Sequence, residues 1–546
     1  QWLRAGRCDV VLCGGTDAIS EFVLSGFHSL RAQSKGPCQP FDRARSGLNL
    51  GEGAAFLVLE SEEHASRRGQ RIRAYLSGYG LSCDANHMTG PDRQGRGAAR
   101  AMSAALADAG LGAEAVDFVS AHGTATVFND AMEARGLELV LGERSATVPV
   151  NSIKGSLGHT LGAAGALEAV MAVRALEEQV IPPTAGLGER DPEIALHIVA
   201  GAPQATPLSV VLSTSSGFGG VNAALVLCRA AAGGAVRRAA EPLAIVAAGA
   251  LFPRADEPLG PLLPTEVPPT LAGQLARMDR LCALAACAAE RALGGGWQLR
   301  QAPRWPAEQI AVIVGSFYGC HKTDEDYYRT VLAQKPSPRL FAYTLPSSPV
   351  GELSILHGLR GPGLAVVGAR SAGLAALAEA SALLHSGQVA ACLVVAVEVA
   401  APAVREAWAE SDEEGADAAV ALLLTRADSP LAAGAAFGYI AGAASAYQAD
   451  APTVALSQAA AETLQAAARP PGSVAAVLSD EITRRYLPSE LQAAALPPAL
   501  ASGQHGCAAA LQALLGAAAG EAGSALVLSG DLDGQAGGVL WSRSLP

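Results

Sequence analysis

The sequence predicts an α/β protein made of two related domains, and three observations support this prediction. Short apolar segments of strand length alternate with Ala-rich helical segments along the 546 residues, as in proteins whose sheets are covered by helices. Half of the residues are hydrophobic and 16% are charged, which excludes an intrinsically disordered chain. Several segments of the first half recur in the same order in the second half.

The predicted strands are short apolar runs bounded by Gly or polar residues. In chain order they are residues 9–13, 54–59, 116–120, 147–150, 209–213, 243–247, 310–314, 392–397 and 525–528. The predicted helices are Ala-rich with apolar residues at helical spacing, and they are residues 97–109, 131–141, 163–178, 276–293, 372–386 and 508–519. Residues 1–3 look like the inside of a helix and no initiator Met precedes them, so we expect the chain to be part of a longer polypeptide.

The internal repeat sets the expected domain boundaries. Residues 3–17 align with 384–398 at an offset of 381, residues 116–120 with 474–478, and residues 217–221 with 531–535 at an offset of 314. Residues 229–241 are polar and small, a composition typical of a linker. We therefore expect a first domain at 1–230 that lacks its N-terminal part, a linker at 231–241, and a second domain at 242–546.

Composition excludes several classes of function. The net charge is −12 and no block of Lys or Arg stands out, so we expect no nucleic-acid partner. No uninterrupted apolar run reaches the roughly 18 residues that a membrane span needs. Ten cysteines without a Cys-x-x-Cys pair fit neither a disulfide scaffold nor a zinc ribbon, so we expect no metal and a reducing, cytoplasmic location.

The first chemically informative segment is SAHGTATVFNDAME, residues 120–133. The strand at 116–120 delivers His122 to its carboxyl end, where open α/β sheets bind ligands. Thr124 and Thr126 offer hydroxyls at alternate positions, and Asn129 and Asp130 are suited to cap the helix that follows. A lone His in this place would more often only close a turn, but the attached Thr-x-Thr and Asn-Asp favour a functional site.

Two further segments follow strands in the same way. In NSIKGSLGHTLGAAGALE, residues 151–168, Lys154 and His159 lie in a Gly-rich loop before a helix. Glu168 is interpreted either as the buried partner of a nearby donor or as a simple helix-face carboxylate. In TSSGFGGVN, residues 214–222, glycines on both sides of Phe218 permit unusual backbone angles.

Together these three segments resemble the C-terminal half of a β-ketoacyl-ACP synthase, the ketosynthase family of condensing enzymes with the thiolase fold. The stretches PFDRARSGLNLGEGAAFLVLE at 40–60 and HMTGPD at 87–92 support the resemblance, which covers residues 1 to about 230. Ser46 departs from the family, which often has Asp there. The resemblance implies a layered α/β/α/β/α fold and decarboxylative condensation of malonyl-ACP with a Cys-bound acyl chain, in fatty acid or type II polyketide synthesis.

The resemblance also implies a role for each site residue. His122, Lys154 and His159 would be catalytic, with two neutral imidazoles donating to the extender's enolate oxygen and Lys154 disfavouring their protonation. Thr89, Thr124 and Thr126 match positions that contact the pantetheine arm, and Phe218 matches the gating Phe. The expected supporting residues are Asp130, Glu133 and Glu168. The implied substrates ride on the 4′-phosphopantetheine of acyl carrier protein, and no free cofactor is expected.

None of the ten cysteines has the context of the family's nucleophile, so we expect that residue outside this chain. In the second domain Arg370 occupies the nucleophile position. The position equivalent to His122 is Asp480, that equivalent to Lys154 is Pro498, and that equivalent to Phe218 is Leu532. The position equivalent to His159 is either Gly503 or His505. The second domain therefore resembles a chain-length factor, a non-catalytic ketosynthase-like partner, and we expect the two domains to form a pseudo-dimer.

Two other functions remain open at this point. One is a non-catalytic scaffold or chain-length factor that binds carrier protein without turnover. The other is a thiolase, which shares the fold but uses CoA and a second Cys near the C-terminus, and residues 213–222 contain no Cys.

Overall fold

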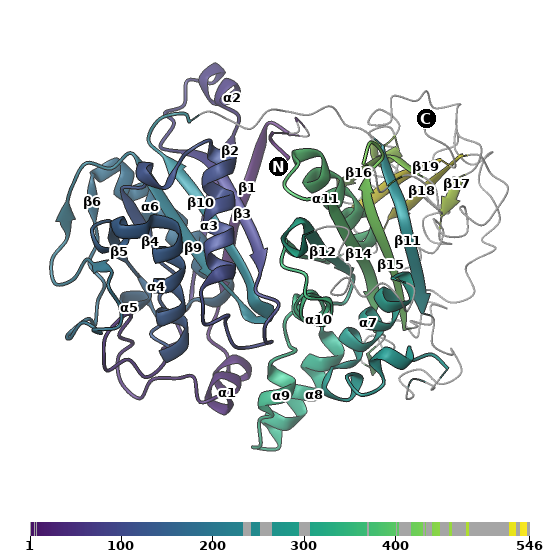
Figure 1. Ribbon diagram of the computed structural model, residues 1–546, viewed down its shortest axis with the longest axis horizontal. Helices are drawn as coiled ribbons and strands as arrows, with labels where there is room; N and C mark the ends of the chain where they lie inside the picture. Colours follow the sequence, from purple (N-terminus) through teal and green to yellow (C-terminus); the bar gives the residue numbers. More distant parts are fainter. Residues whose placement is uncertain are drawn as a thin grey trace. The chain divides into compact units, whose positions relative to one another are not determined.

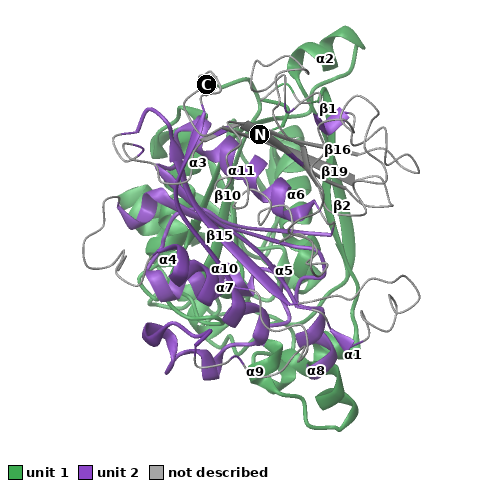
Figure 2. Cartoon of the chain, turned by 90° about the vertical axis from the view of Figure 1, so that its right-hand side faces the viewer, with its two compact units in different colours: residues 1–237, 327–341 green, residues 238–326, 342–546 purple. Residues whose placement is uncertain are grey.

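The computed structural model divides the chain into two compact units, coloured separately in Figure 2. Unit 1 is Gln1–Arg237 with Tyr327–Phe341, and unit 2 is Arg238–Asp326 with Ala342–Pro546. The structure describes residues 2–4, 6, 8–232, 242–251, 262, 265–293, 306–368, 371–399, 401–402, 417–429, 432, 439–447, 458–460, 463, 477–479, 524–530 and 535–542.

Unit 1 is built on a six-stranded mixed sheet in the order β3-β10-β9-β4-β5-β7, of which β3, β10, β9, β4 and β5 are labelled in Figure 1. The strands are β3 (Tyr75–Cys83), β4 (Phe118–Ser120), β5 (Pro149–Asn151), β7 (His197–Ile198), β9 (Val210–Ser216) and β10 (Val221–Cys228). The pairs β9–β4, β4–β5 and β5–β7 are parallel, and β10 is antiparallel to both of its neighbours. The carboxyl ends of β4 and β5 therefore lie side by side at one edge of the sheet.

Helices cover this sheet on both faces. The helices of unit 1 are α1 (Glu21–Ser29), α2 (Glu62–Arg67), α3 (Arg96–Ala109), α4 (Val127–Leu141), α5 (Lys154–Leu157), α6 (Ala164–Glu178) and α9 (Pro338–Phe341), and those that cover the sheet are α3, α4 and α6. A Cβ at Gly80 would collide with the backbone of α3, so this glycine lets the helix approach β3 closely. On the other face α6 packs against β9 and also against an antiparallel pair of strands, β1 (Val10–Asp17) and β2 (Gly53–Glu60). A small second ribbon pairs β6 (Val180–Ile181) with β8 (Gln204–Ala205).

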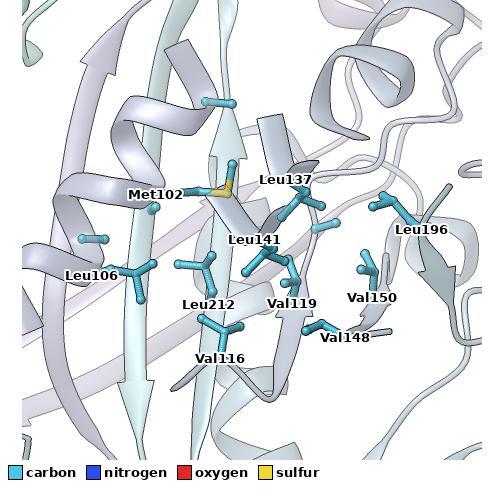
Figure 3. Close-up of a cluster of buried hydrophobic side chains, with 14 of the residues drawn as sticks. Met102, Leu106, Val116, Val119, Leu137, Leu141, Val148, Val150, Leu196 and Leu212 are labelled. Atoms are coloured by element: carbon cyan, nitrogen blue, oxygen red, sulfur yellow. The ribbon is translucent and has the colours of Figure 1, made fainter. Parts of the chain in front are cut away.

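The main core of unit 1 lies between the sheet and helices α3 and α4. Figure 3 shows Met102 of α3, Leu137 of α4 and Val119, Val150 and Leu212 of the strands among the packed side chains. Each of these residues is at most 2% exposed, so this core is dry. Burying each such side chain stabilises the fold by about 1.5–3 kcal/mol, which fixes the strands that carry the site.

Unit 2 contains a nine-stranded sheet in the order β13-β12-β14-β15-β11-β16-β19-β18-β17. Its strands are β11 (Leu243–Leu251), β12 (Ile310–Ser316), β13 (Gly363–Val367), β14 (Ala391–Glu398), β15 (Ala418–Arg426), β16 (Tyr439–Tyr447), β17 (Val477–Ser479), β18 (Ser524–Gly530) and β19 (Gln535–Ser542). Helices α7 (Arg280–Ala292) and α11 (Ala372–Ser386) pack against it, and α10 (Ser348–His357) packs against α7. Helix α8 (His321–Leu332) is divided between the two units after Asp326.

The internal repeat is visible in the strands. β1 and β14 have the same length and stand 381 positions apart, and the pair β9–β10 stands 314 positions before β18–β19. The order β3-β10-β9-β4 in unit 1 recurs as β16-β19-β18-β17 in unit 2. Among the described residues of unit 1, the antiparallel pair β1–β2 matches β14–β15 but no strand matches β11, β12 or β13.

Several sequence-based elements need correction. Residues 2–4 form turns rather than a helix, and the Gly6 N–H donates to Leu3 O at 3.0 Å. The helix predicted to start at residue 276 begins at Arg280, because the side chain of Asp279 caps it by accepting from the Cys282 N–H. The helix at 372–386 has the predicted bounds, and the helix predicted at 508–519 lies outside the described residues. No described helix combines the length and the apolar character that crossing a membrane requires.

Candidate functional site

The site is built at the carboxyl ends of β4 and β5. These strands are parallel, and Ser120 at the end of β4 pairs with Asn151 at the end of β5. His122 follows β4 by two residues and Lys154 follows β5 by three, so the register brings the two loops together. The structure thus places His122 and Lys154 beside each other, as the strand-end positions predict.

Lys154 is completely enclosed by acceptors. Its Nζ forms an ion pair with Glu168 on α6, lies 2.6 Å from the His122 carbonyl oxygen, and lies 3.3 Å from Nδ1 of His122. An ammonium group has three N–H donors, and these three acceptors use all of them. Lys154 therefore orients His122, and Glu168 is the buried partner of a donor, the first of its two possible roles.

His159 is held by its backbone and by its ring. Its N–H donates to Asn49 O at 2.7 Å, and its carbonyl accepts from Gly51 N at 3.0 Å. The Leu161 N–H donates to Nδ1 of the ring at 3.1 Å. The imidazole of His159 stands perpendicular to that of His122, with the ring centroids 5.3 Å apart.

Both imidazoles are neutral, with the proton on Nε2. Burial lowers the pKa of His122 well below its usual value, and the positive charge of Lys154 lowers it further. Burial, then Lys154, lowers the pKa of His159 to about 3. Because a donor faces Nδ1 in each ring, Nδ1 is the acceptor and Nε2 carries the hydrogen. Burial contributes more to these shifts than the repulsion by Lys154 that the sequence suggests.

Glu133 fixes the loop that carries His122. Its carboxylate accepts from His122 N at 2.6 Å, from Gly123 N at 2.8 Å and from the Thr214 hydroxyl at 2.8 Å. Gly123 has a φ of +38°, and a Cβ there would meet the Ser152 side chain. Burial raises the pKa of Glu133, and the three donors oppose that rise.

Asp130 does not cap the helix that follows His122, contrary to the sequence-based expectation. Helix α4 starts at Val127 with Thr126 as its N-cap residue, so Asp130 lies inside the first turn. Its carboxylate instead accepts from Phe41 N at 2.8 Å and from Ala125 N at 3.1 Å. It thereby ties two loops of the site together, and burial raises its pKa to about 7.

The three predicted pantetheine-contacting threonines lie in two loops. The hydroxyls of Thr124 and Thr126 lie 2.9 Å apart in the His122 loop. Thr89 belongs to the loop after β3, where its N–H donates to His87 Nδ1 at 3.1 Å. A backbone hydrogen bond joins the Thr89 loop to the loop that carries Phe218, because Gly219 N donates to Met88 O at 2.6 Å.

Phe218 belongs to an aromatic cluster. Its ring centroid lies 5.9 Å from that of Phe27 on α1 and 6.5 Å from that of Phe341 on α9. Tyr327 packs on Phe341 at 5.4 Å and donates its hydroxyl hydrogen to Phe22 O at 3.2 Å. Sequence reasoning missed Phe27 and Phe341, since no local pattern connects residues so distant in the chain.

Cys38 lies beside the loop that carries Thr124. Burial raises the pKa of the Cys38 thiol, which donates to Thr124 O at 3.7 Å and so is a protonated structural thiol. Among the residues that the structure describes, no group of His, Cys, Asp and Glu is arranged to hold a metal ion. Arg370 lies outside the described residues, as do Asp480, Pro498, Gly503, His505, Leu532 and all of the linker but its first two residues.

Two family models match the chain. Residues 1–65 and 266–411 match "Beta-ketoacyl synthase, N-terminal domain", and residues 73–188 match "Beta-ketoacyl synthase, C-terminal domain". Together the two models cover more than half of the chain.

Similar proteins were found in sequence and in structure. The chain is 43% identical over 224 residues to "Nodulation protein E" of Rhizobium meliloti, and 42% identical over 230 residues to "3-oxoacyl-[acyl-carrier-protein] synthase 2" of Synechocystis sp.. Each match covers 41% of this chain and 55% of the relative, so the chain spans about half the length of the curated relatives it matches. The solved structure "PfaC Keto synthase-Chain length factor" matches with a TM-score of 0.82 at 19% identity, covering all of this chain and 70% of that one, which shows a shared thiolase-like fold.

Proposed function

We propose that this chain, which belongs to the β-ketoacyl synthase family, carries the decarboxylating centre of a 3-oxoacyl-[acyl-carrier-protein] synthase. The observation that carries the proposal is the pair of buried, neutral imidazoles of His122 and His159, with ring centroids 5.3 Å apart. Each presents an Nε2–H, because Nδ1 is already engaged.

In the proposed step, the thioester carbonyl oxygen of a malonyl group accepts hydrogen bonds from both Nε2–H groups. The bond between the α-carbon and the carboxylate breaks, CO2 leaves, and the electron pair forms an enolate whose negative oxygen the two donors stabilise. Donors fixed in a dry site stabilise such charge most effectively, and losing one typically costs about 10²–10³ in rate. The enolate carbon then attacks an acyl thioester, whose thiolate departs as the carbon–carbon bond forms.

Lys154 acts in this scheme without touching the substrate. Its ammonium holds the His122 ring and disfavours a second positive charge at either imidazole. Glu168 compensates the buried ammonium, and Glu133 and Asp130 hold the loop. We assign the acyl-bearing thiol to no described cysteine.

The substrate class follows from the same proposal. Malonyl and acyl groups would arrive on the 4′-phosphopantetheine of acyl carrier protein, whose amides Thr124 and Thr126 are suited to bind. Phe218 would gate the acyl chain, and its N–H would donate to the acyl carbonyl. Thr89, on the loop tied to Gly219, would contact the same arm. The protein would act in the cytoplasm in fatty acid or polyketide synthesis.

We propose that the second half of the chain, residues 242–546, is a non-catalytic, chain-length-factor-like partner in a pseudo-dimer with the first, joined by the linker at 231–241. The repeated strand order of unit 2 supports its descent from the same fold. Arg370, Asp480 and Pro498 provide neither a thiolate nor a second imidazole–lysine pair.

The test is decarboxylation of malonyl-ACP by the full-length protein that carries this chain. Conversion to acetyl-ACP is followed by mass spectrometry for wild type, His122→Ala and His159→Ala, with His64→Ala on the surface helix α2 as the matched control. Each site variant should lose about 10²–10³ in rate, while the control stays at the wild-type rate. Carrier-protein binding without any turnover of the wild type would contradict the proposal and favour the scaffold function.

A further inference from the structure

The turn that carries the ring-orienting N–H of His159 rests on the end of strand β1. The turn is Thr160–Ala163, closed by Ala163 N donating to Thr160 O at 2.9 Å. Leu161, whose N–H engages Nδ1 of His159, has a φ of +47°, in the left-handed region that disfavours a residue with a side chain. A strained turn keeps one conformation only where its surroundings hold it there.

Two residues of β1 contact this turn and restrict its conformation. Gly15 faces the turn, and a Cβ there would collide with the Gly162 carbonyl oxygen. Asp17, two residues on and so on the same face of the strand, accepts the Gly162 N–H at 3.0 Å. Gly162 is the residue next to Leu161, so this bond fixes the peptide that follows the ring-orienting N–H.

The position of Asp17 also suits its charge. Helix α6 begins at Ala164, and its N-cap residue Ala163 makes no side-chain cap. The Asp17 carboxylate therefore lies beside the uncapped, positive end of the helix that carries Glu168, the partner of Lys154. The Asp17 side chain of β1 therefore lies next to both the Thr160–Ala163 turn and the start of helix α6.

We propose that Asp17 is a positioning residue that holds the Thr160–Ala163 turn, so that Leu161 N–H occupies Nδ1 of His159 and the Nε2–H remains free for substrate. Without the carboxylate, the Gly162 N–H loses its acceptor and the turn relaxes away from the left-handed Leu161. The ring of His159 then loses its Nδ1 donor and populates the Nδ1–H tautomer. The effect on turnover rests on the proposed function, whereas the effect on the tautomer does not.

The experiment compares Asp17→Ala and Asp17→Asn with wild type in the full-length protein. Asp9→Ala, which removes an exposed carboxylate just before the same strand, is the matched control. Histidine labelled with 15N reports the tautomer of His159, and the spectrum of His159→Gln assigns its signal among those of the other histidines. Malonyl-ACP decarboxylation reports kcat and KM.

In Asp17→Ala, we expect His159 to gain a Nδ1–H population and kcat to fall by about 10- to 100-fold with KM little changed, since the defect is one of alignment. Asp17→Asn keeps an acceptor oxygen and should stay close to wild type, as should Asp9→Ala. An unchanged His159 tautomer in Asp17→Ala would overturn the inference, whatever the activity. If Asp17→Ala does not fold, Asp17→Ser, whose hydroxyl is too short to reach Gly162, replaces it with the same expectations. A wild type without turnover would refute the proposed function alone and leave the tautomer result to decide the role of Asp17.

Discussion

Replacing Glu133 with Gln tests whether one buried carboxylate holds the His122 loop in place. Its Oε1 accepts from His122 N and from the Thr214 hydroxyl, and its Oε2 accepts from Gly123 N. Gln keeps only one oxygen, so its NH2 group must face one of the two backbone N–H groups. A buried donor without an acceptor costs about 1–3 kcal/mol, and each of the two remaining bonds loses about 1 kcal/mol when the charge is removed.

Desolvation works in the opposite direction. Burial raises the pKa of Glu133, which means that the folded protein already bears a cost for burying its charge, and Gln removes that cost. We therefore expect Glu133→Gln to lower the free energy of unfolding by about 2–3 kcal/mol, equal to a roughly 30- to 160-fold change in the unfolding equilibrium.

Urea unfolding of Glu133→Gln measures this difference, and hydrogen exchange of a peptide covering residues 118–126 locates it. Glu138→Gln is the control, because Glu138 is exposed on the same helix, α4, and should change stability by less than about 0.5 kcal/mol. If the two variants unfold at the same urea concentration and exchange alike, Glu133 does not hold the loop and the reasoning is refuted.

Three further outcomes are expected. Burial lowers the pKa of His159 to about 3 from 6.5, so below pH 6.5 the unfolded chain takes up a proton that the folded protein does not. The free energy of unfolding therefore falls as the pH drops from 6.5 toward 3, by an amount on the order of 5 kcal/mol. Urea unfolding at different pH values should show that His159→Phe abolishes this loss. Phe341→Ala removes a ring packed on Phe218, and we expect it to raise kcat/KM for long acyl chains relative to short ones by about tenfold or more. Leu332→Ala, which alters an exposed side chain, should leave this preference unchanged. The same preference in both variants would contradict the gating role. Asp480→Asn should leave turnover unchanged, and a loss would show that the second half is catalytic.

The parts of the site that sequence predicts are those carried by strand ends. His122 and Lys154 each follow an apolar strand, and because those strands are parallel neighbours, the residues had to meet. Glu168 could not be decided in the same way, since a carboxylate on a helix pairs with Lys154 only if α6 packs at this place. That packing depends on contacts among distant segments, which local pattern does not encode.

The errors have equally local causes. Asp is a residue type that often caps helices, but the N-cap residue of α4 is Thr126. The Asp130 carboxylate instead accepts a hydrogen bond from the buried Phe41 N–H. The strand β3 was not predicted, because two glycines interrupt its apolar pattern. A Cβ at either of them, Gly78 or Gly80, would collide with the backbone of α3, a requirement that appears only in the packed structure.

The central claim is that His122 and His159 donate to one substrate oxygen. A crystal structure of the full-length protein with a malonyl-pantetheine analogue that cannot lose CO2 tests this most directly. We expect the thioester-equivalent oxygen to lie about 2.7–3.2 Å from Nε2 of both rings, with Lys154 still bound to Glu168 and His122. An oxygen that contacts only one imidazole, or that takes its hydrogen bond from Lys154 instead, would contradict the account.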